Sequence, residues 1–207
     1  MPKQQEGNDM LKGMAAILFA GLVAACTAEA PLTSASWQLN GSASDITVIS
    51  VKNGDVAEIS RFEQLSGSVS PAGEARLSID AASFESHVDI RNERLRDIFF
   101  EISAFPDIRL TANLDPATFE SLAIGDNLET ELQLAISLHG TVRTVYAPVR
   151  VIRNGEDSVL VVSAEAALID AREFGLGAAV EALAGIAGLD SITPVFPVHV
   201  YLVFERS

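Results

Sequence analysis

The chain has 207 residues, of which 48% are hydrophobic, and a formal net charge of −14 at pH 7. This acidic balance, with no cluster of lysine and arginine, argues against a protein that binds nucleic acid through a basic surface. The single cysteine excludes an intramolecular disulfide. The length suits one domain with its own hydrophobic core.

The first predicted element is a signal peptide over residues 1–25. Lys12 precedes an apolar run over residues 14–23 that is too short for a permanent transmembrane helix, and Ala24 and Ala25 suit a peptidase cleavage site. Residues 1–9 are polar and include two acidic side chains, so Met10 is an alternative start of the chain.

The sequence Val23-Ala24-Ala25-Cys26 resembles the lipobox of bacterial lipoproteins. The resemblance implies cleavage before Cys26, lipid attachment to its thiol, and a tether to the membrane over residues 26–36. Thr27 stands where an aspartate often retains lipoproteins in the inner membrane, which favours the outer membrane. An ordinary signal peptide with an incidental cysteine is the alternative interpretation.

The domain is predicted over residues 37–207, where apolar and polar residues alternate in separated runs. This period of two is typical of strands that turn one face to a core. Turn sequences rich in Asn, Gly, Asp and Pro separate the runs. We expect an all-β fold, a closed antiparallel barrel of about eight strands, because closure removes exposed edges. A two-sheet sandwich is the alternative. The runs cover residues 46–49, 75–80, 108–114, 131–138, 145–152, 159–166 and 198–204.

Two stretches depart from this alternation and predict short helical insertions. Residues 91–103 carry apolar side chains at helical spacing before Pro106, and residues 176–189 form an alanine-rich and glycine-rich second helix. Phe99 and Phe100 are adjacent in the first helix, so we expect that they do not both face inward.

Five motifs follow one another along the chain: Ser44-Asp45-Ile46-Thr47-Val48, residues 62–67, residues 79–84 followed by 91–100 and Phe105-Pro106, Leu138-His139-Gly140-Thr141-Val142, and residues 170–176. Their sequences and order resemble those of the YceI-like, polyisoprenoid-binding family of periplasmic, lipocalin-like barrels. The run from Arg91 to Phe100 departs from the family pattern, because Asn92 and Arg94 replace its usual aspartate and histidine.

The resemblance implies a periplasmic, lipid-anchored binding protein that holds an isoprenoid, a quinone or another apolar lipid in the barrel lumen. Four arginines are candidates for the mouth, where arginine can bind a phosphate or a quinone oxygen: Arg91, Arg94, Arg96 and Arg172. Pairing with nearby acidic residues is the alternative. Candidates for the lumen, which can equally be plain core, are Phe62, Phe84, Phe99, Phe100, Phe105, Ile136, Leu138 and Phe174.

Neither catalysis nor a cofactor is expected. The chain lacks the recognisable signatures of nucleophilic, zinc-dependent and dinucleotide-binding enzymes, and three isolated histidines give little support to a metal site. The competing hypothesis is a structural or interaction barrel of the envelope with a filled core. Small inward residues favour an open lumen instead: Ala112, Ala135, Ala147, Ala164 and Ala166.

Overall fold

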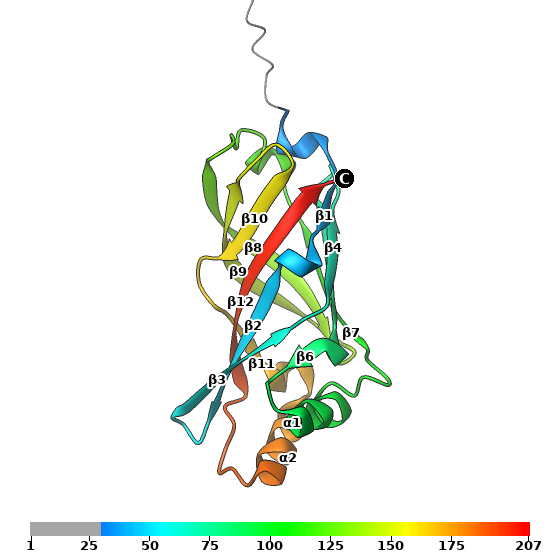
Figure 1. Cartoon of the computed structure of the whole chain (residues 1–207), viewed down its shortest axis with the longest axis vertical. Coiled ribbons are helices and arrows are strands. Elements are labelled where there is room, and N and C mark those ends of the chain that lie inside the picture. Colours follow the sequence, from blue (N-terminus) through cyan, green and yellow to red (C-terminus); the bar gives the residue numbers. More distant parts are fainter. Residues whose placement is uncertain (1–29) are drawn as a thin grey trace, which may run out of the picture.

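The computed structural model describes residues 30–207, which form one curved antiparallel sheet with two helices at one end (Figure 1). The predicted signal peptide and Cys26 lie outside the described residues. The strands are β1 (Trp37–Leu39), β2 (Asp45–Lys52), β3 (Val56–Phe62), β4 (Leu65–Val69), β5 (Glu74–Asp80), β6 (Phe84–Glu85), β7 (Asp107–Asn113), β8 (Asn127–Leu138), β9 (Thr141–Arg153), β10 (Ser158–Ser163), β11 (Ala167–Asp170) and β12 (Val195–Arg206).

Strand β1 closes the sheet into a barrel. Trp37 lies opposite Val69 of β4 on one side and opposite Arg206 of β12 on the other. The ring therefore runs β1-β4-β5-β7-β8-β9-β10-β12 and returns to β1, with every pairing antiparallel. The predicted closed barrel of eight strands is confirmed, and the two-sheet sandwich is excluded.

Four further strands extend the barrel along the long strand β12. Residues 201–206 of β12 pair with the ring strands β10 and β1, whereas residues 195–201 pair with β11 and β2. Strand β3 then pairs with β2, and β6 pairs with β3. This extension carries the β2–β3 hairpin to the end of the molecule where the helices lie (Figure 1).

Two short helical insertions are also confirmed, and both lie at this same end, which we call the helical end. Helix α1 (Asp89–Arg94) continues into the π-helical segment η4 (Leu95–Phe99), which contacts α2 (Gly177–Ala187). The remaining helical turns are single 3-10 turns: η1 (Leu32–Ser34), η2 (Gly41–Ala43), η3 (Ala81–Ser83), η5 (Pro116–Thr118) and η6 (Ala171–Phe174).

The π-helical segment overturns the expectation for the two adjacent phenylalanines. The backbone N–H of Phe100 donates to the Leu95 carbonyl oxygen at 2.8 Å, a bond that spans five residues. Phe99 ends the segment and Phe100 follows it, and their rings meet edge to face at a centroid distance of 5.0 Å. Both side chains are buried and both line the interior, contrary to the expectation for neighbouring residues of the helix.

The opposite end, which we call the terminal end, binds part of the predicted tether. Leu32 is buried against Trp37, whose indole N–H donates to the Leu32 carbonyl oxygen at 2.9 Å. Arg153, only 2% exposed, donates to the carbonyl oxygens of Ala30 at 2.7 Å and Leu122 at 3.0 Å. Packing on the barrel thus begins before the expected domain boundary at Trp37.

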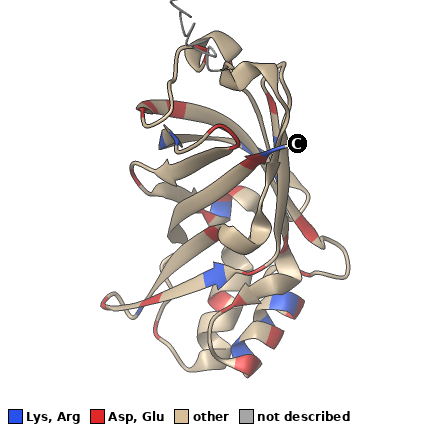
Figure 2. Cartoon of the chain, turned by 45° about the horizontal axis from the view of Figure 1, so that its top comes forward, with Lys and Arg blue, Asp and Glu red and all other residues tan. Residues whose placement is uncertain are grey.

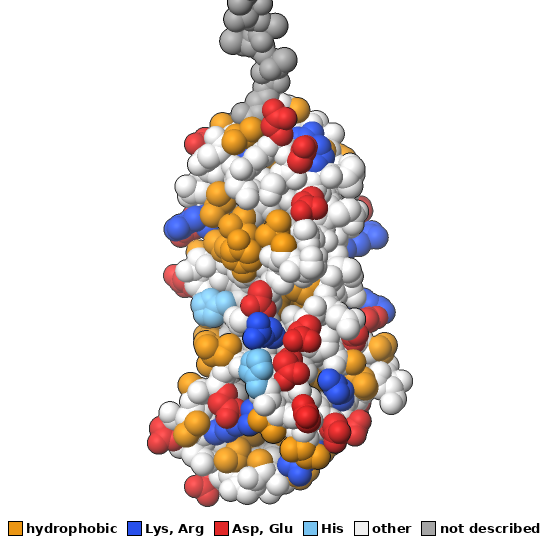
Figure 3. All heavy atoms as spheres, in the orientation of Figure 1, with side chains coloured by type: hydrophobic (Ala, Val, Ile, Leu, Met, Phe, Trp, Pro, Cys, Tyr) orange, Lys and Arg blue, Asp and Glu red, His pale blue; other side chains and the backbone are white. Residues whose placement is uncertain are grey.

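The outer surface is largely polar but contains an apolar patch. Figure 3 shows acidic side chains spread over the visible face and a hydrophobic patch over β10 and β12. In these two strands the outward positions pair Leu160 with Val203 and Val162 with Tyr201. In the part of the chain that the structure describes, no helix has the length and apolar character needed to cross a membrane.

Candidate functional site

The barrel encloses a cavity of about 670 Å³, which is within the usual range for sites that bind small molecules. Its walls are the inward apolar side chains of the alternating strands, such as Ile46, Ile108 and Val161. The cavity runs from the helical end to the cluster around Trp37 at the terminal end. A filled core, on which the interaction-barrel hypothesis depends, is therefore not observed.

Of the five alanines that were expected to leave the lumen open, only some line the cavity. Ala112 and Ala147 line the cavity, whereas Ala135, Ala164 and Ala166 are absent from its lining. Ala75, Ala167 and Ala171 line it in addition.

Aromatic rings line the cavity near the helical end. Phe62 contacts Phe84 at a centroid distance of 5.0 Å and Phe100 at 5.9 Å, and Phe99 contacts Phe196 at 6.2 Å. The structure thus brings Phe62, Phe84, Phe99 and Phe100 together, and it adds Phe196 of β12, which the sequence did not single out. Ile136 and Leu138 line the same cavity from β8.

Two of the candidate phenylalanines lie outside the lining. The Phe105 ring packs on His139 at a centroid distance of 4.4 Å and fits against Gly140, where an added Cβ would lie 2.9 Å from the ring. His139 and Gly140 form the β8–β9 turn with positive φ angles of 49° and 72°. Phe174 is the last residue of η6 and is buried in the hydrophobic core.

Arg172 also lies outside the lining. Its guanidinium binds the carboxylate of Asp170, with the shortest contact at 2.6 Å, and both hydrogen bonding and charge from Arg172 lower the pKa of Asp170. The side chain is exposed on η6. The alternative of an ion pair is therefore realised, with Asp170 as the partner.

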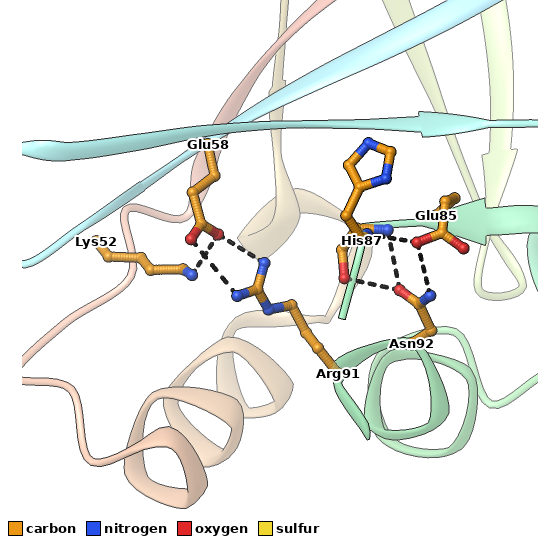
Figure 4. A network of polar contacts seen from close by, with 7 residues as sticks. Lys52, Glu58, Glu85, His87, Arg91 and Asn92 are labelled. Carbon is orange, nitrogen blue, oxygen red and sulfur yellow. Dashed lines mark hydrogen bonds and ion pairs between the residues drawn. The ribbon is translucent and has the colours of Figure 1, made fainter. Parts of the chain in front are cut away.

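Arg91 does line the cavity and belongs to a cluster of charged residues at the helical end (Figure 4). Its Nη1 lies 2.6 Å from the Glu58 carboxylate, which also binds Lys52. The hydrogen bond from Lys52 and the charge of Arg91 lower the pKa of Glu58, although partial desolvation opposes them. Figure 4 shows Lys52 and Arg91 reaching the same carboxylate from the β2–β3 hairpin and from α1.

A second polar network fixes the start of α1 and with it the position of Arg91. Asn92 is 3% exposed, and its Oδ1 accepts hydrogen bonds from the backbone N–H of Ser86 at 2.9 Å and from the Ser86 hydroxyl at 2.7 Å. Its Nδ2 donates to Glu85 at 2.9 Å, which lowers the pKa of Glu85 together with the His87 N–H. Asn92 is thus a structural residue outside the cavity lining.

The β2–β3 hairpin is held over the same end by the segment that follows α2. The Asn53 side chain accepts a hydrogen bond from the Asp190 N–H at 2.9 Å, and the backbone of Lys52 forms an isolated antiparallel β-bridge with that of Ile192. Exposed lining residues Val88 and Ile90 show that the cavity reaches the surface here. Another exposed part of the lining lies at Pro71, near the β4–β5 turn.

The model of the YceI-like domain matches residues 37–204. The chain belongs to the YceI-like family. Among solved structures, this YceI-like chain is similar to a polyisoprenoid-binding domain from Saccharophagus degradans implicated in plant cell wall breakdown, with 32% identity and a TM-score of 0.81. That match covers 84% of this chain and 99% of the other.

This chain also resembles a second solved structure, BcnA from Burkholderia cenocepacia, in fold alone. The identity is 18% and the TM-score 0.61, over 80% of this chain and 98% of that one. Comparison with curated proteins gives no match.

The walls of this YceI-like cavity suit binding more than reaction chemistry. Among residues 30–207, no group of three His, Cys, Asp or Glu side chains is arranged to hold a metal ion. The lining residues include no histidine, cysteine or carboxylate. What the site offers a ligand is a long apolar surface with a few cations and hydroxyl groups near its ends.

Proposed function

We propose that this YceI-like protein binds an apolar lipid, such as an isoprenoid, a quinone or a fatty acyl chain, in the barrel cavity. The observation that carries the proposal is the cavity of about 670 Å³ with apolar walls along its length. The similarity to a polyisoprenoid-binding domain over 84% of the chain supports it.

Hydrophobic burial alone can supply the affinity. Each methylene group that enters the cavity contributes about 0.8 kcal/mol, so ten contribute about 8 kcal/mol. Ordering and association oppose binding by about 4–15 kcal/mol, so a long chain is required for tight binding. The aromatic rings at the helical end and Trp37 at the other end extend the apolar contact over the whole length of the cavity.

We propose in addition that the protein works in the bacterial periplasm as a lipoprotein, anchored through Cys26. The lipobox-like sequence before Cys26 supports this, and Thr27 favours the outer membrane. Ala30 is bound by Arg153 at the terminal end. Four residues span at most about 14 Å, so an anchor on Cys26 would hold the terminal end near the membrane and turn the helical end away.

We further propose that the protein acts by binding and not by catalysis. The described lining contains no histidine, carboxylate or cysteine, which supports this. The protein would take up and release the lipid without altering it chemically, as a carrier or a storage protein does.

The test of the binding function uses Trp37, the only tryptophan of the chain, which lines the cavity. The domain after Cys26 is suitable, because the barrel closes within residues 30–207 and the Saccharophagus degradans domain aligns over 99% of its chain. We expect the fluorescence of Trp37 to change saturably as geranylgeraniol or a ubiquinone is added. Absence of any change with prenols, quinones and fatty alcohols, confirmed by calorimetry, would contradict the proposal.

The anchor is tested separately by metabolic labelling of the full chain with an alkyne fatty acid. We expect label in the wild-type chain and none in the Cys26→Ser variant. Label in both, or a wild-type chain that is released unlabelled into the soluble fraction, would contradict lipid attachment at Cys26.

A further inference from the structure

The charged residues of the cavity lining all have the same sign. The whole chain has 28 acidic and 14 basic residues, yet the lining contains no carboxylate. Its charged members are Lys52, Arg76, Arg91 and Arg94. A cavity that merely avoided charge would exclude both signs, so this selection of cations in an acidic protein calls for a ligand of negative charge.

Three of these cations lie at the helical end. Lys52 is the last residue of β2, and Arg91 and Arg94 are three residues apart on α1, which places them on one face of the helix. Arg76 is in β5, away from this group, and pairs with Glu74 at 3.4 Å. Figure 2 shows basic and acidic residues intermixed on the helices, while most of the barrel ribbon is uncharged.

Internal ion pairs neutralise this group only in part. Lys52 and Arg91 share the single carboxylate of Glu58. Arg94 is half-buried, and it makes no ion pair or side-chain hydrogen bond with any other residue of the described chain. Three cations against one carboxylate leave an excess of positive charge at the mouth, and a partly desolvated guanidinium without a partner favours an anion strongly.

The cavity wall also changes from apolar to polar toward this mouth. Along β2 the side chains that face the cavity are Ile46, Val48, Ser50 and Lys52. Along the neighbouring strand β3, Phe62 and Ser60 face the cavity, and Ser60 lies opposite Val48. The hydroxyl groups of Ser50 and Ser60 make no hydrogen bond with other residues of 30–207. The wall therefore matches a ligand with an apolar chain and one polar end.

We infer that the lipid ends in an anionic head group, a phosphate or a carboxylate, that binds Arg94 together with Arg91 and Lys52 at the helical end. This inference rests on the proposed lipid-binding function and specifies the class of ligand. The apolar chain extends from the head group past Phe62 and Phe99 toward Trp37. Ser50 and Ser60 donate hydrogen bonds to the head-group oxygens.

The test compares ligands that differ only at the head: geranylgeranyl phosphate against geranylgeraniol, and hexadecanoate against hexadecanol. Because a charge-assisted hydrogen bond contributes more than a neutral one, we expect the anion of the preferred pair to bind about ten- to a hundredfold more tightly. Preference within the first pair identifies a phosphate, and preference within the second a carboxylate. Equal affinity within both pairs would overturn the inference.

Two variants locate the head group. Arg94→Gln removes the guanidinium and should abolish most of the preference for the anion, because the affinity for the anion falls much more than the affinity for the alcohol. The control is Arg61→Gln, which removes an exposed cation of β3 that lies outside the lining. A preference that survives Arg94→Gln, or that Arg61→Gln removes equally, would overturn the assignment.

A gain of affinity provides an independent readout should Arg94→Gln fail to fold. Glu58→Gln removes the carboxylate that competes for Lys52 and Arg91, so the anionic ligand should bind several-fold more tightly while the alcohol is unaffected. Unchanged or weaker binding of the anion would contradict the inference. If all four ligands fail to bind wild-type protein, the lipid-binding function itself fails; if the alcohols bind as well as the anions, only the head-group inference fails.

Discussion

Arg153 donates a hydrogen bond of 2.7 Å to the carbonyl oxygen of Ala30, from the last residue of β9 to the first described residue of the chain. The same guanidinium binds the Leu122 carbonyl oxygen at 3.0 Å and is almost completely buried. It therefore joins three segments of the terminal end: the N-terminal segment, the β7–β8 connection and the barrel wall. Orientation of the barrel relative to an anchor at Cys26 depends on this contact.

The first prediction concerns this buried arginine. Arg153→Ala leaves two carbonyl oxygens without their charged donor, and hydrogen bonds to charged groups contribute about 1.5–3 kcal/mol. We expect the free energy of unfolding to fall by about 2–4 kcal/mol in a urea titration. The control is Arg150→Ala on the same strand, whose exposed ion pair with Glu129 should contribute less than about 1 kcal/mol. Equal losses in the two variants would contradict the assigned role.

The second prediction concerns the open cavity. Ala147→Phe places an aromatic ring in the lumen, so lipid uptake measured by Trp37 fluorescence should fall at least about tenfold, with little change in the urea midpoint because space is available. Thr144→Phe puts the same ring on the exposed side of β9 and serves as the control. Undiminished uptake by a folded Ala147→Phe variant would place the lipid elsewhere.

The third prediction concerns Glu58 and pH. Lys52 and Arg91 lower the pKa of Glu58 in the folded protein, so its contribution to stability is full above the pKa of the unfolded chain, about 4.3. The contribution is lost as the pH falls through the lower pKa of the folded state. The difference in free energy of unfolding between wild type and Glu58→Gln should therefore shrink below about pH 4. A difference that grows on acidification would contradict the direction of the shift.

The fourth prediction concerns the network that fixes α1. Asn92→Ala leaves the buried N–H and hydroxyl of Ser86 without their acceptor, at a cost of about 2–3 kcal/mol in the free energy of unfolding. Hydrogen exchange over residues 89–99 should accelerate more than exchange in β8 and β9. Glu93→Ala changes the exposed neighbour and should leave both measurements unchanged. Uniform acceleration throughout the protein would show that the network stabilises the whole barrel and not α1 in particular.

The barrel could be predicted from the sequence because alternation has a direct structural cause. In β8, every second residue faces the lumen, and the same parity places Leu132, Leu134, Ile136 and Leu138 in the cavity wall. The order of the strands around the ring could not be predicted in this way. Closure by the three-residue strand β1 depends on two pairings with distant segments, which alternation in so short a strand does not reveal.

The lining of the cavity could be predicted where parity or helical spacing applies and not where the chain turns. Phe105 follows the π-helical segment and instead packs on the β8–β9 turn, and Phe174 lies in a 3-10 turn with no fixed inward face. Lys52 was overlooked because a lysine at the end of a strand usually indicates solvent. Its even spacing from Ile46 contained the signal that it faces the lumen.

The central claim is that the barrel holds a lipid, and native mass spectrometry of the domain purified from a bacterial periplasm tests it most directly. We predict one lipid per protein, released on organic extraction, and lost from the Ala147→Phe variant but retained by Thr144→Phe. A wild-type protein that has the mass of its polypeptide alone, and that keeps this mass after incubation with prenols, prenyl phosphates, quinones and fatty acids, would contradict the claim.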